Sequence, residues 1–97
     1  MKPIIFLPEA EKEMVEASRY YERQQEGLGD RFLLMIQAAA AETAERPGAC
    51  PVIRGPIRRK LVRRFPYGLL FREEEEAIVI LAVAHLRRRP GYWLPRI

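Results

Sequence analysis

The sequence predicts one α+β domain in which an N-terminal strand and an antiparallel hairpin of two helices pack on a C-terminal three-stranded antiparallel meander, in the order β-α-α-β-β-β. The first observation behind this prediction is size, because 97 residues that are 48% hydrophobic have room for one core and no second domain. The second is periodicity, which is helical over residues 8–46 and extended after residue 56. Helices followed by a run of strands are typical of a helix layer on an antiparallel sheet.

A proline separates the first strand from the first helix. Pro3–Leu7 is short, apolar and partly β-branched, which favours a strand. Pro8 suits the first position of a helix, where its missing N–H costs nothing. Three glutamates then suit the positive end of the helix dipole: Glu9, Glu11 and Glu13. The residues at helical spacing that form the buried stripe are Ala10, Met14, Ala17 and Tyr21.

The second helix follows a glycine-rich connection. Gly27-Leu28-Gly29 interrupts the helical period and supplies flexible backbone for a tight turn. The second helix ends at Pro47-Gly48. Because the connection is short, the two helices are expected to lie antiparallel. The apolar face of the second helix consists of Leu28, Phe32, Met35, Ile36, Ala39 and Thr43.

The C-terminal half is expected to consist of strands. A loop rich in proline and glycine covers 47–56, and the predicted strands are Ile57–Arg64, Tyr67–Arg72 and Ala77–His85. The acidic run Glu73–Glu76 is interpreted as a solvated turn, since four consecutive carboxylates diverge and do not form a metal site. The unbroken apolar run of the last strand indicates a central strand that is covered on both faces.

Several function classes are not supported by the sequence. The apolar stretch Ala77–Ala84 is far shorter than the roughly 20 residues that cross a bilayer, so we expect no membrane partner and a cytoplasmic location. Cys50 is the single cysteine, which excludes an internal disulfide, and no nearby base marks it as a nucleophile. No metal-ligand cluster, phosphate-binding glycine loop or catalytic triad pattern is present, so we expect neither a metal nor a cofactor. His85 is interpreted as a histidine at the core edge, bonded to backbone.

Charge is divided unevenly along the chain. Residues 1–50 hold six Lys and Arg against nine Asp and Glu, whereas residues 51–97 hold eleven against four, so the halves carry −3 and +7. Such asymmetry steers anionic ligands to one side and favours nucleic acid or an acidic protein segment as the partner. A solvated basic surface without a partner remains the alternative.

The candidate site is a set of basic and aromatic residues around the predicted meander. Arginine forks bind phosphate or carboxylate bidentately, and aromatic rings provide stacking platforms or interface anchors. We expect these side chains to converge on a surface that the helices do not cover. If the protein is an enzyme, the catalytic candidates are Arg59, Arg87 and Tyr92. The candidates for contact with a protein partner or nucleic acid are Arg58, Lys60, Arg63, Arg64, Arg88, Arg89 and Trp93.

Strand alternation limits that convergence. It places Arg59 and Arg63 on one side of the basic strand, and Arg58 and Lys60 on the other, so some of the charge protects the sheet edge against aggregation. For Tyr92 and Trp93 two roles stay open, which are packing of the C-terminal tail and direct contact with a partner.

Six segments stand in a characteristic order and spacing along nearly the whole chain. They are Phe6-Leu7-Pro8-Glu9-Ala10, Tyr20-Tyr21-Glu22, Gly27-Leu28-Gly29-Asp30-Arg31-Phe32, Arg63-Arg64-Phe65-Pro66-Tyr67, Ile80-Leu81-Ala82-Val83-Ala84-His85 and Arg87-Arg88-Arg89-Pro90-Gly91-Tyr92-Trp93. Together they resemble the RelE/ParE superfamily of bacterial toxins from type II toxin–antitoxin, or plasmid stabilisation, modules.

The resemblance implies a toxin that a cognate antitoxin holds inactive, and it leaves three functions open. RelE-like members cut ribosome-bound mRNA without a metal, ParE-like members poison DNA gyrase, and a third possibility is an inactive toxin that only binds its antitoxin. In the ribonuclease branch one arginine follows the tyrosine of the middle strand and another follows the last strand. Gly68 and Leu86 stand at those places here.

These departures favour the ParE-like branch. Metal-free RNA cleavage needs a base, an acid and cations for the extra phosphate charge, and each missing cation contact is expected to slow it by about 100-fold or more. Arg59 and Tyr92 lie near basic and tyrosine positions of the ribonuclease branch, and Arg87 or Arg88 would replace a lost arginine if the last strand contains a bulge. Leu7 is a further departure, because Ser or Thr often precedes the proline and caps the first helix.

Overall fold

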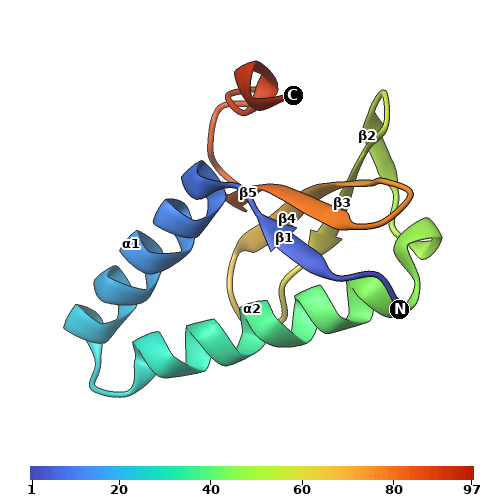
Figure 1. Cartoon of the computed structure of the whole chain (residues 1–97). Coiled ribbons are helices and arrows are strands. Elements are labelled where there is room, and N and C mark those ends of the chain that lie inside the picture. Colours follow the sequence, from blue (N-terminus) through green and yellow to red (C-terminus); the bar gives the residue numbers. More distant parts are fainter.

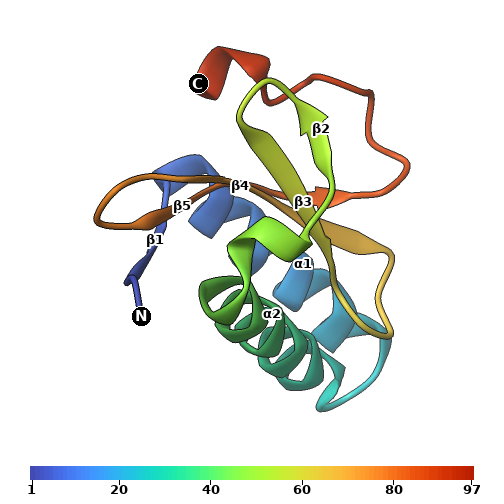
Figure 2. The ribbon, with the colours of Figure 1, turned by 90° about the vertical axis from the view of Figure 1, so that its right-hand side faces the viewer.

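The computed structural model describes residues 1–97 and confirms the α+β class. Two helices form one layer, a sheet forms the other, and the C-terminal segment crosses the far side of the sheet (Figures 1 and 2). The elements in order are β1 (Ile4–Phe6), α1 (Pro8–Gln24), α2 (Leu28–Glu45), the 3-10 turn η1 (Pro47–Ala49), β2 (Val52–Arg54), β3 (Ile57–Leu61), β4 (Tyr67–Glu73), β5 (Ile78–His85) and the 3-10 turn η2 (Leu94–Arg96). No helix is long and apolar enough to span a bilayer.

The sheet has five strands in the order β1-β5-β4-β3-β2. The predicted antiparallel meander is present as β3, β4 and β5, and β1 joins it in parallel beside β5. The strand count of the prediction is wrong, because part of the expected loop at 47–56 forms β2. Val52 and Arg54 pair with β3 across a turn at Gly55, whose φ of 52° favours glycine.

The basic strand is shorter than predicted. β3 ends at Leu61, so Arg63 and Arg64 lie in the turn to β4 and not in a strand. The physical reason is local backbone geometry, since Arg64 adopts a φ of 69° that no strand allows. The Val62 N–H donates to the Tyr67 carbonyl and closes this turn.

The helices follow the predicted pattern. α1 begins at Pro8, and Leu7 supplies no side-chain hydrogen bond as its cap. The connection between the helices is tight because a Cβ on Gly29 would lie 2.5 Å from the Ser18 carbonyl oxygen. The carboxylate of Glu22 accepts the N–H groups of Gly27 and Gly29, each at 2.9 Å, and so fixes the turn.

Two hydrophobic clusters lie on opposite faces of the sheet. The larger lies between the sheet and the helices and includes Phe32, Ile36 and Phe71. The smaller packs the other face against the C-terminal segment and includes Leu70, Leu81 and Trp93. β5 is therefore covered on both faces, as its sequence predicts, but its second cover is the C-terminal segment.

Candidate functional site

Arg59 lies on the sheet face that is turned away from the helices. It pairs with Leu70, and Leu70 belongs to the cluster under the C-terminal segment. The aliphatic part of the Arg59 side chain lies over Gly68, since a Cβ there would stand 3.0 Å from both Cγ and Cδ of Arg59. Gly68 therefore makes room for Arg59, and a larger residue at this position would push the guanidinium aside.

A groove of about 300 Å³ separates this face from the C-terminal segment, and we call it the tail-side groove. Its charged lining residues are Arg54, Arg59, Arg88 and Arg89, and none of its 14 lining residues is acidic. The β2–β3 hairpin rises on the same side as the C-terminal segment (Figure 2) and brings Arg54 to it. The groove is thus a concave surface of one charge sign.

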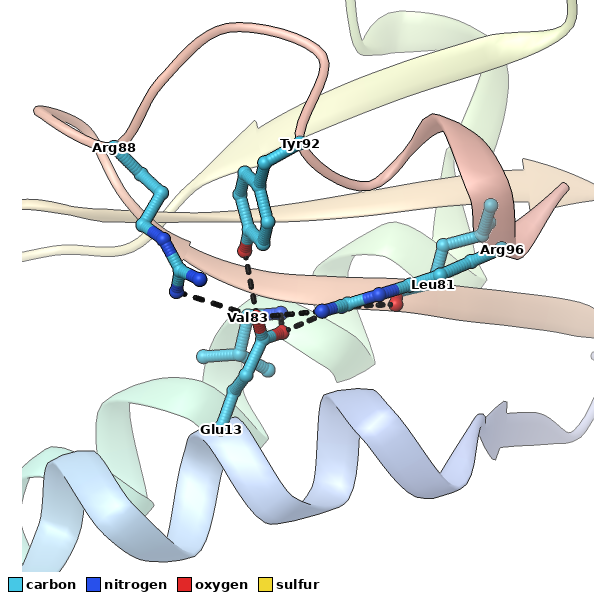
Figure 3. Close-up of polar contacts among 6 residues, drawn as sticks. All are labelled: Glu13, Leu81, Val83, Arg88, Tyr92 and Arg96. Atoms are coloured by element: carbon cyan, nitrogen blue, oxygen red, sulfur yellow. Dashed lines mark hydrogen bonds and ion pairs between the residues drawn. The ribbon is translucent and has the colours of Figure 1, made fainter.

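Glu13 fixes the C-terminal segment beside this groove (Figure 3). Its side chain is 12% exposed, and its carboxylate accepts hydrogen bonds from Tyr92 Oη at 2.8 Å and from both terminal nitrogens of Arg96 at 2.8 and 3.0 Å. Arg88 lies 3.8 Å from the same carboxylate. A single acidic side chain on α1 therefore fixes the segment that forms one wall of the groove.

Glu13 and Arg96 also bind backbone groups along the free edge of β5. β1 ends at Phe6, opposite Ile80, so no strand pairs with the rest of that edge. The Val83 N–H donates to Glu13 at 3.0 Å, and Arg96 donates to the Leu81 carbonyl at 3.0 Å. Backbone groups that a strand would satisfy are satisfied here by an ion pair.

Tyr92 is held in its neutral form. Burial, with the hydrogen bond to Glu13, raises the pKa of its hydroxyl well above the usual range. The guanidinium carbon of Arg88 lies 4.1 Å from the centre of the ring, and Trp93 is 5% exposed. Both aromatic residues therefore pack the tail onto the sheet.

The remaining predicted basic residues lie elsewhere. Arg58 faces the helix side and donates to the carbonyls of Cys50 at 2.6 Å and Gly48 at 3.4 Å. Lys60 forms an ion pair with Glu42 of α2 at 2.8 Å, and the pKa of Glu42 is lowered mainly by this hydrogen bond. The side chain of Arg87 is exposed and does not line the tail-side groove, while its backbone N–H donates to Nδ1 of His85 at 3.0 Å.

Arg63 and Arg64 line a second groove, of about 580 Å³, at the end of the helix hairpin. We call it the hairpin-end groove. Its third basic residue is Arg31, and its apolar lining consists of Tyr21, Leu28, Leu34, Met35, Phe65 and Pro66. The predicted basic residues thus divide, with Arg59, Arg88 and Arg89 at one groove and Arg63 and Arg64 at the other.

Sequence reasoning missed three contributors. Arg54 lies in the segment 47–56, for which the sequence predicts a loop. Arg31 lies on the exposed side of a helix for which the sequence pattern predicts only the buried face. Glu13 was assigned to the helix dipole alone. A signal for Glu13 was present, because it lies between Ala10 and Ala17 at helical spacing and so places a carboxylate next to the buried stripe.

Comparisons with known proteins agree with this architecture. The model of the family described as "ParE toxin of type II toxin-antitoxin system, parDE" matches residues 4–90. A search of curated proteins found no significant match. Among solved structures, a chain of the chromosomal ParDE toxin–antitoxin system from P. aeruginosa superposes with a TM-score of 0.63 and 15% identity, covering 88% of this chain and 96% of that one.

The structural likeness supports the fold, and the sequence match supports the family. The matched residues extend from β1 to the arginines that follow β5, so they include the helix hairpin and the whole sheet. The chain therefore belongs to the ParE toxin family of type II toxin–antitoxin systems, on the ParE-like branch of the RelE/ParE superfamily.

Proposed function

We propose that this toxin binds DNA gyrase and blocks supercoiling, and that a cognate antitoxin keeps it inactive in the cytoplasm. The observation that carries the proposal is the family match over residues 4–90, since the ParE-like branch acts on gyrase. We assign the target to the tail-side groove, where the basic C-terminal half presents Arg54, Arg59, Arg88 and Arg89.

The chemistry of the tail-side groove supports binding over cleavage. A metal-free ribonuclease needs a base, an acid and several cations around the scissile phosphate. Here Gly68 and Leu86 occupy places where the ribonuclease branch carries arginines. The Tyr92 hydroxyl already donates to Glu13, which removes it as a free acid.

The hairpin-end groove has the properties that an antitoxin segment requires. Its floor is apolar, Leu34 is 59% exposed, and Arg31, Arg63 and Arg64 line it. An amphipathic helix with acidic flanks would bury its apolar face there and pair its carboxylates with the arginines. We therefore assign this groove to the antitoxin and the tail side to the target.

A supercoiling assay tests the gyrase proposal. Purified toxin is expected to block supercoiling of relaxed plasmid by gyrase and to increase cleaved DNA complexes, and addition of the antitoxin should reverse both effects. Normal supercoiling at micromolar toxin would contradict the proposal.

One observation favours a second function, ribosome-dependent mRNA cleavage. Arg59, Arg88 and Tyr92 all line one groove, as a cleavage site would require. Under this alternative, toxin added to translating ribosomes should produce cuts inside codons, and Arg59→Ala together with Arg88→Ala should abolish them. If induction neither arrests growth nor affects either target, the protein is an inactive toxin that only binds antitoxin.

A further inference from the structure

Two apolar side chains lie exposed among the arginines of the tail-side groove, and we call them the aliphatic pair. Ile53 of β2 is 39% exposed, Leu86 after β5 is 48% exposed, and both line the groove. A Cβ on Gly68 would stand 3.7 Å from Cδ2 of Leu86 and 3.0 Å from Cγ and Cδ of Arg59. The methyl groups of Leu86 and the methylene groups of Arg59 therefore lie side by side. A partner that covers this surface with apolar atoms gains free energy.

An irregularity of β2 explains why Ile53 reaches the groove. Consecutive side chains of a regular strand point to opposite faces of the sheet. The pairing of β2 with β3 shifts register between Val52 and Arg54, so Ile53 is an extra residue on β2. Such a bulge re-aims a side chain, and the consecutive residues Ile53 and Arg54 both line the tail-side groove. An apolar group and a cation therefore face the same ligand.

The aromatic residues of the groove offer no open platform to a nucleic acid. Bases bind single-strand sites by stacking on exposed aromatic rings. The guanidinium carbons of Arg88 and Arg96 lie 4.1 and 5.1 Å from the centre of the Tyr92 ring, and Trp93 is 5% exposed. The open apolar surface is instead aliphatic, and it suits the packing of an apolar side chain from a protein.

Charge and size restrict the protein partner. The groove is lined by Arg54, Arg59, Arg88 and Arg89. None of its lining residues is acidic, so carboxylates are the complementary groups on a partner. Its volume of about 300 Å³ is at the lower end of the range for small-ligand pockets. The groove therefore has room for the side chains of a short segment and not for a folded element.

We propose that the tail-side groove binds a short acidic protein segment, with one large apolar side chain against the aliphatic pair and flanking carboxylates against the four arginines. This inference rests on the assignment of the target to this groove. It deepens that assignment, because it selects the protein over the DNA in a complex of the two. The aliphatic pair slows dissociation, and the arginines speed association.

Fluorescence anisotropy with the full chain and a labelled peptide of alternating leucine and glutamate tests the proposal. The wild type should bind this peptide about ten-fold more tightly than polyglutamate of the same length, because the leucine is buried. The double variant Ile53→Ala, Leu86→Ala should bind it about ten-fold more weakly, mainly through faster dissociation. In the wild type, the ¹³C methyl signals of Ile53 and Leu86 should shift when the peptide is added.

Matched controls separate the groove from general loss of apolar surface. Val52→Ala together with Leu61→Ala removes side chains that are 54% and 55% exposed and lie outside the tail-side groove. This double variant should keep the wild-type affinity, and so should Leu34→Ala in the hairpin-end groove. Replacing both Arg54 and Arg89 by glutamine should instead slow association and reduce its dependence on salt.

Three results would overturn the proposal. They are equal affinities of the wild type for the two peptides, equal affinities of the two double variants for the leucine–glutamate peptide, and tighter binding of a single DNA strand with the same number of charges. The last result would assign the groove to nucleic acid.

The supercoiling assay distinguishes failure of this inference from failure of the gyrase proposal. The Ile53→Ala, Leu86→Ala protein should need about ten-fold more protein than the wild type to block gyrase, in line with its weaker binding. If both proteins block gyrase equally, the groove assignment is wrong and the gyrase proposal stands. If the wild type leaves supercoiling normal but binds the leucine–glutamate peptide through the aliphatic pair, only the gyrase proposal is wrong.

Discussion

The two basic grooves of this protein differ in how their arginines are supported. The lining of the tail-side groove includes four arginines and no carboxylate, and the half-buried Glu13 behind the wall fixes the segment that carries two of them and lies 3.8 Å from Arg88. In the hairpin-end groove three arginines line an apolar floor, and Arg63 is paired with Glu42 at 3.0 Å. The first suits a short acidic segment, and the second suits an acidic amphipathic helix. Two grooves lined by arginines therefore suit different ligands, because the residues around and behind those arginines differ.

The largest expected effect comes from removing the support of the tail-side groove. Glu13→Ala leaves Arg96, Tyr92 and the Val83 N–H without their acceptor. We expect a loss of about 2–3 kcal/mol in the free energy of unfolding, because one partner of a mostly buried ion pair is deleted. Urea unfolding monitored by circular dichroism measures this loss.

The control for that change is Glu16→Ala, on the exposed side of the same helix. It should alter stability by no more than about 0.5 kcal/mol. Equal losses in the two variants would show that Glu13 does not anchor the tail.

The next effect concerns the hairpin-end groove. Reversing its charge with Arg63→Glu and Arg64→Glu should slow association with the antitoxin by about ten-fold or more, because rim charges steer encounter. The same reversal at Arg19 and Arg23 of α1 should leave the rate unchanged. Surface plasmon resonance with immobilised antitoxin measures both, and equal rates for the two double variants would remove this groove as the docking site.

A smaller effect is expected at Gly68. A Cβ at this position would meet Cγ and Cδ of Arg59 at 3.0 Å, so Gly68→Ala should displace the guanidinium and cost about 1 kcal/mol of stability. Gly48→Ala is the matched control, since its Cβ meets nothing within 4 Å. An unmoved Arg59 Nε–H signal in the Gly68→Ala protein would contradict the packing described here.

The smallest effect is the pH dependence of the Glu42 ion pair beside β3. The hydrogen bond from Lys60 lowers the pKa of Glu42 below its ordinary 4.5, so the folded state binds this proton less readily than the unfolded state. The stabilisation that the ion pair gives the folded state is therefore present at pH values above the ordinary pKa of Glu42. It is lost as the pH falls through the lowered pKa of the folded state. Urea midpoints of the wild type should fall more than those of Glu42→Gln between neutral pH and about pH 3. An equal fall of the urea midpoint in the two proteins would show that the Glu42 ion pair makes no pH-dependent contribution to stability.

The fold was largely predictable because its signals are local. The apolar stripe predicts α1, Pro47 predicts the end of α2, and the apolar run Ala77–Ala84 predicts β5. β2 was not predictable, since its three residues lie between Pro51 and Gly55-Pro56 and form a strand only because β3 pairs with them. Tertiary pairing decided that segment against its turn-forming neighbours.

The site was predictable only in part, and the predictable part again depends on a local sequence pattern. Alternation along β3 separates Arg59 from Arg58 and Lys60, and the structure places them on opposite faces. The sequence held no sign that the strand would stop before Arg64, because arginine rarely adopts a positive φ. Arg63 and Arg64 were consequently assigned to a strand although they belong to the other groove.

The most direct test of this division is a supercoiling assay of the wild type and of the Arg63→Glu, Arg64→Glu protein, each with and without antitoxin. We expect both proteins to block gyrase, and we expect the double variant to need more antitoxin than the wild type before supercoiling is restored. Rescue of both proteins at the same antitoxin concentration, or failure of the double variant to block gyrase, would contradict the assignment of target and antitoxin to separate surfaces.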